Sequence, residues 1–311
     1  MEQISAHKPV LLAEMLKMLA PKPDGYYLDC TFGNGGYSSA ILDSCNCNLV
    51  AIDRDPNVKA RAEQFANNYQ DKFKFIESSF AESFDKLGAQ KFDGVVMDLG
   101  VSSMQIDSPE RGFSFMYDGP LDMRMSNCGM SAADFINNAE EEDIANVIYK
   151  YGDETFSRKI ARKIIEQRKL EPIITTGRLA HIVRTSIGFK KGKIDTATKT
   201  FQAIRIYINN ELGQLAMFLN NVQNVLAENG RLIVVSFHSL EDRIVKEFFK
   251  EYAPKILARS KYSTKPIEEI DSQKWLTIIT KKPIYPTDDE IRTNYRARSA
   301  RLRAAQNMRN L

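Results

Sequence analysis

The sequence predicts a doubly wound α/β fold that is interrupted by a helical module. Three observations predict this fold. Short apolar runs alternate with helix-like stretches over the first hundred residues, residues 106–204 contain no convincing buried strand, and the alternation then resumes. A chain of 311 residues is long enough for one large domain or two modest ones. We therefore expect a core formed by residues 1–105 and 205–311, with residues 106–204 inserted as a helical domain.

Four strands are expected in the first hundred residues. They are short continuous apolar runs, as strands buried on both faces should be, and they lie at residues 26–28, 49–52, 73–76 and 94–97. Helix-like stretches lie between them at residues 38–42 and 56–67. The second stretch is preceded by Asp55 and begins with Pro56, which is an N-cap followed by proline at the first helical position. This alternation is typical of a doubly wound sheet.

The inserted part is expected to be helical, and the α/β alternation returns after it. A segment rich in glycine, proline and aspartate at residues 108–120 is followed by helical stretches at residues 132–137, 141–150, 156–169 and 176–185. One long helix is then expected over residues 200–226, with Asn229 and Gly230 as its C-cap. The remaining elements are expected as strands at residues 231–237, 275–280 and 299–304 and a helix at residues 240–252.

Composition excludes several classes of protein. No apolar run approaches the roughly 18 residues that cross a bilayer. Residues 1–8 are polar and lack a signal-peptide core. The four cysteines do not form a secreted disulfide pattern, and none of the three histidines lies beside a cysteine pair. We therefore expect a reduced cytoplasmic setting, no membrane partner and no metal site.

The net charge of +3 is unevenly distributed along the chain. Residues 292–309 contain six arginines and no acid, residues 158–169 carry basic side chains at helical spacing, and residues 190–193 form a basic loop. One basic helix face is commonly just solvated surface. Three basic groups together favour a polyanionic partner.

The run at residues 29–36 predicts a turn that binds a nucleoside. Asp29 closes a short β-like segment, and Gly33, Gly35 and Gly36 follow in a tight turn. A dinucleotide fingerprint would place a third glycine at position 38, where this chain has Ser38. S-adenosylmethionine, which has no phosphate, therefore fits better than NAD. A dinucleotide-dependent oxidoreductase remains the less favoured alternative.

Further candidates follow the predicted strands, at the edge where open α/β sheets bind ligands. Asp53 lies eighteen residues after Gly35, about where a carboxylate accepts hydrogen bonds from both ribose hydroxyls. Phe80 follows the third strand and would place its ring against adenine, Asp98 ends the fourth strand, and His238 follows the fifth. Two structural alternatives remain open: Asp53 as a helix N-cap, and His238 as a core histidine satisfied by the backbone.

Residues 111–125 mix aromatic, acidic and basic side chains. Phe113 and Phe115 stand at alternate positions and are expected to be buried, in a lid over the pocket or in a seam between modules. Asp122 and Arg124 are compatible with reading a base edge, and an internal ion pair explains them equally well.

Long segments of the chain resemble the bacterial RsmH (MraW) family of methyltransferases. The matching segments are residues 7–12 (HKPVLL), 31–36 (TFGxGG), 51–56 (AIDRDP), 98–103 (DLGVSS), 110–115 (ERGFSF), 118–125 (DGPLDMRM), 200–206 (TFQAIRI) and 236–243 (SFHSLEDR). The resemblance implies a class I S-adenosylmethionine-dependent methyltransferase core, a Rossmann-like doubly wound sheet, with an inserted helical substrate-recognition domain. The cofactor contacts that it implies are Gly35, Gly36, Tyr37, Asp53, Phe80, Asp98 and Gln105. Two positions depart from the family, which commonly has histidine at Tyr37 and proline at Tyr295.

The resemblance implies methyl transfer to N4 of a cytidine in the decoding region of 16S ribosomal RNA, within the small ribosomal subunit. Because the N4 lone pair is delocalised into the ring, N4 must be held in line with the methyl donor at roughly 3–3.5 Å. The expected acceptors of its hydrogen bonds are the backbone carbonyls of residues 99–101 and the hydroxyls of Ser102 and Ser103, with Asp122 and His238 as second choices. A ribosome-binding assembly factor with a vestigial cofactor pocket is the other alternative.

Overall fold

The computed structural model describes residues 9–188, 195–254 and 274–308. The chain divides into two compact units, one formed by Met1–Gly100 and Gly213–Leu311 and the other by Val101–Leu212. The expected insertion at residues 106–204 falls inside the second unit, which extends beyond it at both ends. His7, the basic loop at residues 190–193 and Arg309 lie outside the described residues.

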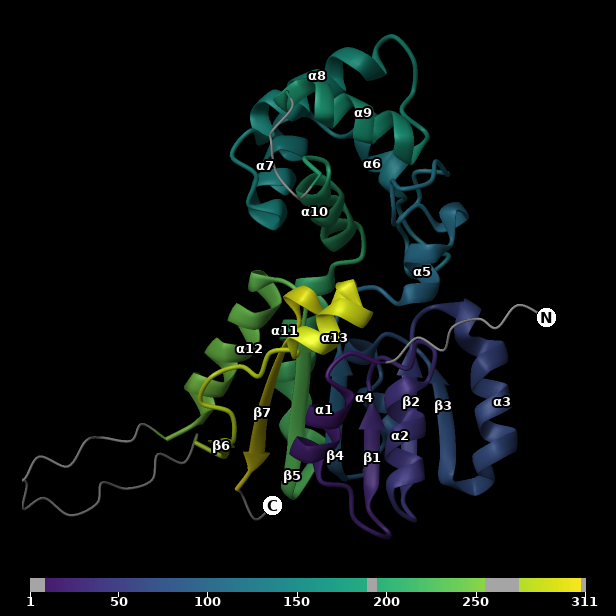
Figure 1. Cartoon of the computed structure of the whole chain (residues 1–311), viewed down its shortest axis with the longest axis vertical. Coiled ribbons are helices and arrows are strands. Elements are labelled where there is room, and N and C mark those ends of the chain that lie inside the picture. Colours follow the sequence, from purple (N-terminus) through teal and green to yellow (C-terminus); the bar gives the residue numbers. More distant parts are fainter. Residues whose placement is uncertain (1–8, 189–194, 255–273, 309–311) are drawn as a thin grey trace, which may run out of the picture. The chain divides into compact units, whose positions relative to one another are not determined.

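The first unit is built on a seven-stranded sheet with the strand order β3-β2-β1-β4-β5-β7-β6 (Figure 1). The strands are β1 (Tyr26–Asp29), β2 (Asn48–Asp53), β3 (Phe73–Glu77), β4 (Phe92–Asp98), β5 (Leu226–Ser236), β6 (Leu276–Ile278) and β7 (Arg301–Asn307). Neighbours from β3 to β5 are parallel, whereas β7 is antiparallel to both β5 and β6. The doubly wound α/β core is therefore confirmed. Sequence reasoning had not predicted the direction of β7.

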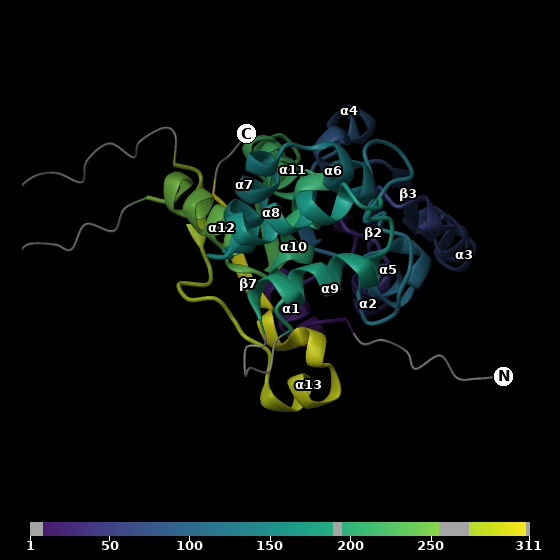
Figure 2. The same cartoon turned by 90° about the horizontal axis from the view of Figure 1, so that it is seen from above.

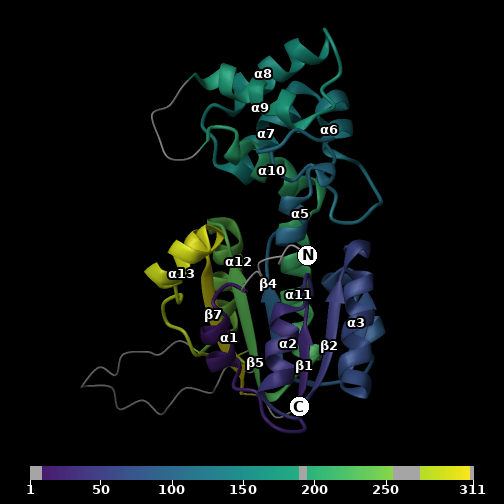
Figure 3. The same cartoon turned by 45° about the vertical axis from the view of Figure 1, so that its right-hand side comes forward.

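Helices cover both faces of this sheet, which explains why its central strands are continuous apolar runs. On one face, α1 (Leu12–Leu19), α2 (Gly36–Ser44) and α3 (Lys59–Tyr69) contribute to one apolar cluster. On the other face, α4 (Phe84–Leu87), α11 (Glu211–Asn221) and α12 (Ser239–Tyr252) contribute to a second cluster. The parallel strands end together at one edge, and α13 (Asp288–Thr293) lies at that same edge (Figure 3).

The single long helix expected over residues 200–226 is wrong. The chain forms α10 (Thr198–Ile208) and α11, and the break falls at Asn209 and Asn210. The Asn209 side chain donates to the Met123 carbonyl at 2.7 Å and accepts from the Met125 N–H at 2.8 Å. Asn210 adopts a left-handed φ of 47°, which a continuing helix does not permit. These partners are more than eighty positions away, so local periodicity carries no sign of them.

The expected C-cap at Asn229 and Gly230 is also wrong. Both residues lie within β5, which begins at Leu226, and Asn229 has a φ of 61°. A left-handed asparagine followed by glycine is as typical of a bend in a strand as of a helix end, so the pair alone does not separate the two.

The second unit is helical (Figure 2). Five of its helices contribute residues to one apolar core. Its helices include α5 (Ser103–Asp107), α6 (Ala132–Asn138), α7 (Glu141–Gly152), α8 (Ser157–Arg168), α9 (Thr176–Ile187) and α10. Phe113 is buried in this core, and the Phe115 ring packs edge-on against Phe201 with centroids 4.8 Å apart. Both phenylalanines are thus used in the packing of their own unit. None of the described helices in either unit is long and apolar enough to span a membrane.

Candidate active site

Three aspartates mark the carboxyl edge of the sheet in the first unit. Asp29 ends β1, Asp53 ends β2 and Asp98 ends β4, and these strands run parallel, so the three side chains leave the sheet at the same edge. We call this group the carboxylate edge. His238 follows β5, the next strand in the sheet, at the same edge. The first unit therefore brings together most of the residues that the sequence singled out.

The turn after β1 has a shape that requires glycine. Gly33 and Gly35 have φ values of 51° and 77°, in the left-handed region. A Cβ on Gly35 would lie 2.4 Å from the Phe65 ring, and a Cβ on Gly36 would lie 2.2 Å from the Pro9 ring. The turn leads into α2, whose first N–H groups have no intrahelical acceptor. They form a set of donors beside the carboxylate edge.

Asp53 ties this turn to the end of β2. Its Oδ2 accepts from the Gly33 N–H at 2.7 Å, and its Oδ1 accepts from the Asp55 N–H at 2.9 Å. Burial raises the pKa of Asp53 to about 6, although the two N–H donors oppose the shift. The N-cap role considered for Asp53 is played by Asp55, whose carboxylate accepts from the Asn57 N–H.

Asp29 and Asp98 differ in how well they are satisfied. Asp29 is fully buried and accepts from the Ser38 hydroxyl at 2.7 Å and from the Thr31 N–H at 3.0 Å. Oδ1 of Asp98 is buried and has no hydrogen-bond partner among the described residues. Burial, together with the nearby carboxylates of Asp29 and Glu241, raises the pKa of Asp98 to about 8. Unsatisfied buried acceptors are rare, so Asp98 is the place where a ligand's donor or cation fits.

Asp29 was missed as a site residue by the sequence analysis, which used it only to mark a strand end. Its bond to Ser38 also gives a structural reason for serine at the position where a dinucleotide fingerprint has glycine. The signal was present in the sequence as a third acid that directly follows an apolar run.

Tyr37 turns its side chain into the protein. The ring is buried in the apolar cluster of α1 and α2, and its hydroxyl donates to the Val10 carbonyl at 2.5 Å. Burial raises the pKa of this phenol well above its ordinary value. Because the side chain is used in packing, a ligand in front of the turn is left with the backbone amide of Tyr37.

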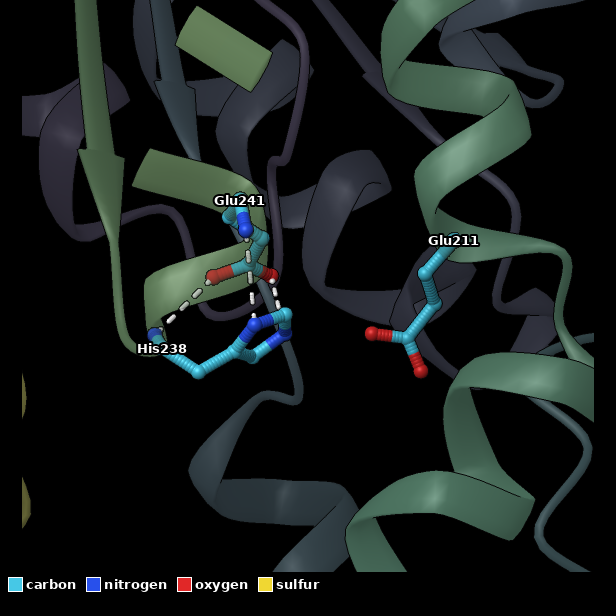
Figure 4. Close-up of side chains that lie close together, drawn as sticks. All are labelled: Glu211, His238 and Glu241. Carbon is cyan, nitrogen blue, oxygen red and sulfur yellow. Dashed lines mark hydrogen bonds and ion pairs between the residues drawn. The ribbon is translucent and has the colours of Figure 1, made fainter. Parts of the chain in front are cut away.

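His238 caps the helix that follows β5. Its Nδ1 accepts from the Glu241 N–H at 3.4 Å, while the Glu241 carboxylate accepts from the His238 N–H at 3.3 Å and the Phe237 N–H at 2.9 Å. Figure 4 shows the imidazole ring and the Glu241 carboxylate facing each other. Nε2 lies 3.1 Å from Oε1 of Glu241 but makes no hydrogen bond within the described part of the chain. The structure thus gives His238 a capping role. Because Nδ1 accepts, the neutral ring carries its proton on Nε2, and this N–H nitrogen lies beside the Glu241 carboxylate.

Phe80 follows β3 in a short 3₁₀ turn, Phe80–Glu82. Its ring is partly buried and packs edge-on against Phe218 with centroids 5.7 Å apart. One part of the ring thus remains accessible near the end of β3, as a stacking contact requires.

The other candidates belong to the second unit. Ser102 and Gln105 form a reciprocal capping box at the start of α5, with hydrogen bonds of 3.3 and 3.0 Å, and Ser103 is the half-buried first residue of that helix. Asp122 accepts from Arg124 at 2.6 and 2.9 Å. Although burial raises it, the pKa of Asp122 is held below its usual value by these hydrogen bonds. Of the two interpretations that the sequence left open for Asp122 and Arg124, the structure contains the internal ion pair.

The basic groups are only partly available to a partner. Exposed basic side chains on α8 are Arg158, Lys159 and Arg162. Arg168, by contrast, donates to the carbonyls of Ile136 and Ala139 at 2.9 and 2.7 Å and so closes the end of α6. In the C-terminal run, Arg303 pairs with the buried Asp242 at 2.6 Å and Arg301 approaches the same carboxylate at 3.5 Å. These arginines have internal roles.

The fold and this site together define a class of protein. A seven-stranded sheet with β7 antiparallel beside β5, a glycine turn after β1 and acids at the ends of β1, β2 and β4 is the arrangement of a class I S-adenosylmethionine-dependent methyltransferase. The model of the MraW methylase family matches residues 4–308. The chain therefore belongs to the MraW methylase family. This confirms the resemblance seen in the sequence, and with it S-adenosylmethionine as the methyl donor.

Individual relatives are similar over nearly their whole length. The chain is 64% identical to "Ribosomal RNA small subunit methyltransferase H" of Rickettsia bellii (strain RML369-C) over 300 residues, which is 96% of this chain and 98% of the relative. It is 64% identical to the protein of the same name from Rickettsia felis over 301 residues, 97% and 98% of the two chains. Among solved structures, an rRNA methylase from Streptococcus thermophilus superposes with a TM-score of 0.44 at 8% identity, covering 98% of this chain and 100% of that one.

Proposed function

We propose that this enzyme methylates N4 of one cytidine in the decoding region of 16S ribosomal RNA, within the small ribosomal subunit and in the cytoplasm. The observation that carries the proposal is the near full-length identity to relatives named as small-subunit ribosomal RNA methyltransferases. The intact carboxylate edge supports it, because an assembly factor without activity would have no need of a buried, unsatisfied Asp98.

The residues around the glycine turn fit S-adenosylmethionine, which supplies an electrophilic methyl group on a sulfonium. We assign cofactor binding to Gly35, Gly36, Tyr37, Asp53, Phe80, Asp98 and Gln105. Within the first unit, the backbone amides that open α2 offer donors, Asp53 offers a carboxylate to ribose hydroxyls, and Phe80 offers its ring to adenine. The unpaired oxygen of Asp98 offers negative charge to a cationic ligand once the carboxyl group loses its proton.

Catalysis of this transfer needs acceptors rather than a strong base, because the N4 proton becomes acidic once the nitrogen carries the new methyl group. The chain's task is to hold N4 in line and to accept its hydrogen bonds. We place the acceptors at the end of β4, in the carbonyls of residues 99–101 and the Ser103 hydroxyl. Ser102 and Asp122 are weaker candidates because the capping box and the Arg124 pair already occupy them. His238 is a weaker candidate as well: its Nδ1 accepts from the Glu241 N–H, so the neutral imidazole carries its proton on Nε2 and offers N4 a donor rather than an acceptor.

The second unit is proposed as the substrate-recognition domain. It carries the exposed basic face of α8, and a cytidine in folded RNA must be splayed out of its stack before it reaches an active site. A basic surface that holds the backbone on either side is suited to that task.

A methyl-transfer assay tests the proposal. The enzyme is incubated with isotopically labelled S-adenosylmethionine and small subunits that lack the modification, and free 16S RNA is tested in parallel. We expect label at a single nucleotide in the decoding region. Tight subunit binding without transfer would favour the assembly factor, and calorimetric binding of NAD in place of S-adenosylmethionine would favour the oxidoreductase.

A further inference from the structure

An exposed aromatic ring backed by arginine precedes β7, at the edge of the sheet where the parallel strands end, and it is not among the residues assigned to the cofactor. Tyr295 begins a short 3₁₀ turn, Tyr295–Ser299, and is 63% exposed. The Arg298 guanidinium lies 4.6 Å from the centre of the tyrosine ring and donates to its hydroxyl at 2.5 Å. Most of the Tyr295 side chain thus remains open to water although the guanidinium lies against it. A tyrosine held in this way is a preformed flat surface.

The turn that carries this ring is firmly anchored in the first unit. Ala297 and Ala300 are fully buried in the apolar cluster of α1 and α2, while the residues between and before them point outward. The Asn294 side chain caps the turn by accepting from the Arg296 N–H at 3.2 Å. The exposure of Tyr295 therefore belongs to an ordered turn with an anchored backbone.

Its position follows from the register of the sheet and from a chain of hydrogen bonds. Arg301, the first residue of β7, pairs with Ser236, the last residue of β5, so the turn before β7 lies at the edge where the parallel strands end (Figure 1). Glu290 of α13 accepts from the Leu11 N–H at 2.7 Å. The neighbouring Val10 carbonyl accepts from Tyr37, which follows the glycine turn. Val10 and Leu11 thus connect the segment that leads to Tyr295 with the glycine turn after β1.

The charge around Tyr295 favours a polyanion that also contains rings. Arg292, Arg296 and Arg298 are exposed around it, whereas Arg301 and Arg303 are turned to Asp242. The nearby acids of α13 are Asp288, Asp289 and Glu290; of these, Asp289 pairs with Arg292 at 3.1 Å and Glu290 is bound to Leu11. Proteins that bind single-stranded nucleic acid combine such arginines with aromatic side chains on which bases stack.

We propose that Tyr295 and Arg298 form a stacking platform for an unpaired base of the RNA substrate, close to the nucleotide that is methylated. This inference rests on the proposed function and adds to it an RNA contact on the first unit. One aromatic face stacks on a base of any identity, so the platform contributes affinity and placement more than sequence choice.

The test compares Tyr295→Ala, Tyr295→Phe and a matched control, Tyr285→Ala, in methyl transfer to small subunits. Tyr285 is an exposed tyrosine of the same unit, at 58%. We expect Tyr295→Ala to raise the KM for subunits about tenfold, with kcat and the Kd for S-adenosylmethionine little changed. Tyr295→Phe keeps the ring and should retain most of the affinity, and Tyr285→Ala should resemble the wild type. Arg298→Gln should reduce the salt dependence of RNA binding by about one counterion.

Several outcomes overturn the platform. An unchanged KM in Tyr295→Ala, or an equal rise in Tyr285→Ala, would show that the ring does not contact RNA. An equal loss of S-adenosylmethionine affinity would show that the substitution disturbs the cofactor turn. If Tyr295→Ala weakened binding to assembled subunits but not to protein-free RNA of the decoding region, Tyr295 would contact a ribosomal protein instead of RNA. If the wild type itself transfers no methyl group, the proposed function fails separately. The platform is then tested by binding alone, and equal binding of wild type and Tyr295→Ala to protein-free RNA of the decoding region would reject it.

Discussion

We predict that S-adenosylmethionine displaces a proton from Asp98 when it binds, and that Asp98→Asn abolishes this proton release. Because the pKa of Asp98 is raised to about 8 by burial and by neighbouring carboxylates, the acid is mainly protonated at pH 7 in the free protein. A cationic ligand beside Oδ1 favours the ionised form, so binding must expel the proton. Between about pH 6 and pH 8 the observed affinity should therefore rise by up to tenfold per pH unit, or about 1.4 kcal/mol, and then level off.

The same shift has a consequence for stability, with a defined sign. The pKa of Asp98 is higher in the folded protein than its ordinary value, so its contribution to stability is fully present below that ordinary value and is lost as the pH rises through about 8. The free energy of unfolding should fall with rising pH by up to about 1.4 kcal/mol per unit from this group, and Asp98→Asn should flatten that slope.

Calorimetry in buffers of different ionisation enthalpy counts the protons released on binding at pH 7, and urea unfolding from pH 5 to pH 8.5 measures the stability slope. The test is the difference between wild type and Asp98→Asn in proton release and in stability slope, because protons exchanged by Asp53 or by the ligand contribute to both proteins. Equal proton release and parallel stability profiles would refute the assignment of Asp98 to a cationic part of the ligand.

Three further predictions concern the cofactor turn and the basic face of α8. Asp53→Ala should weaken S-adenosylmethionine binding by on the order of 2–3 kcal/mol in calorimetry and leave the protein folded; unchanged affinity would contradict the ribose assignment. Tyr37→Phe should cost about 1–2 kcal/mol of unfolding free energy in urea, because the Val10 carbonyl loses its donor, and should keep cofactor affinity within about tenfold; a larger affinity loss would mean that the side chain serves the ligand. Changing Arg158, Lys159, Arg162 and Lys163 to Glu should weaken RNA binding and flatten its salt dependence, whereas an unchanged salt slope would leave that face as solvated surface.

Sequence reasoning located the parallel strands well, and with them the carboxylate edge. Buried parallel strands appear as short apolar runs, and the residue that ends each run lies at the ligand-binding edge whatever the rest of the fold does. Asp53 and Asp98 were identified for this reason. Asp29 occupies the equivalent place on β1, but its bond to Ser38 depends on how the following turn folds back.

Several of the errors share a physical cause, which is that distant partners decide local structure. The break between α10 and α11 depends on the bonds of Asn209 to Met123 and Met125, and no periodicity near residue 209 reveals them. The roles of Arg168 and Arg303 are similar. Both were counted among the basic groups that favour a polyanionic partner, and their acceptors lie far away in the sequence. Asp122 with Arg124 was a case where two explanations fitted the sequence equally, and only geometry separates them.

The chemical identity of the methylated nucleoside tests the central claim most directly. Small subunits are treated with the enzyme and with S-adenosylmethionine that carries a deuterated methyl group, the 16S RNA is digested to nucleosides, and the labelled species is compared by mass spectrometry with standards of N4-methylcytidine, 5-methylcytidine and 2′-O-methylcytidine. We predict one labelled nucleoside, N4-methylcytidine, from a single site in the decoding region. Label in either of the other cytidines, in another base, or in no nucleoside at all would contradict the account.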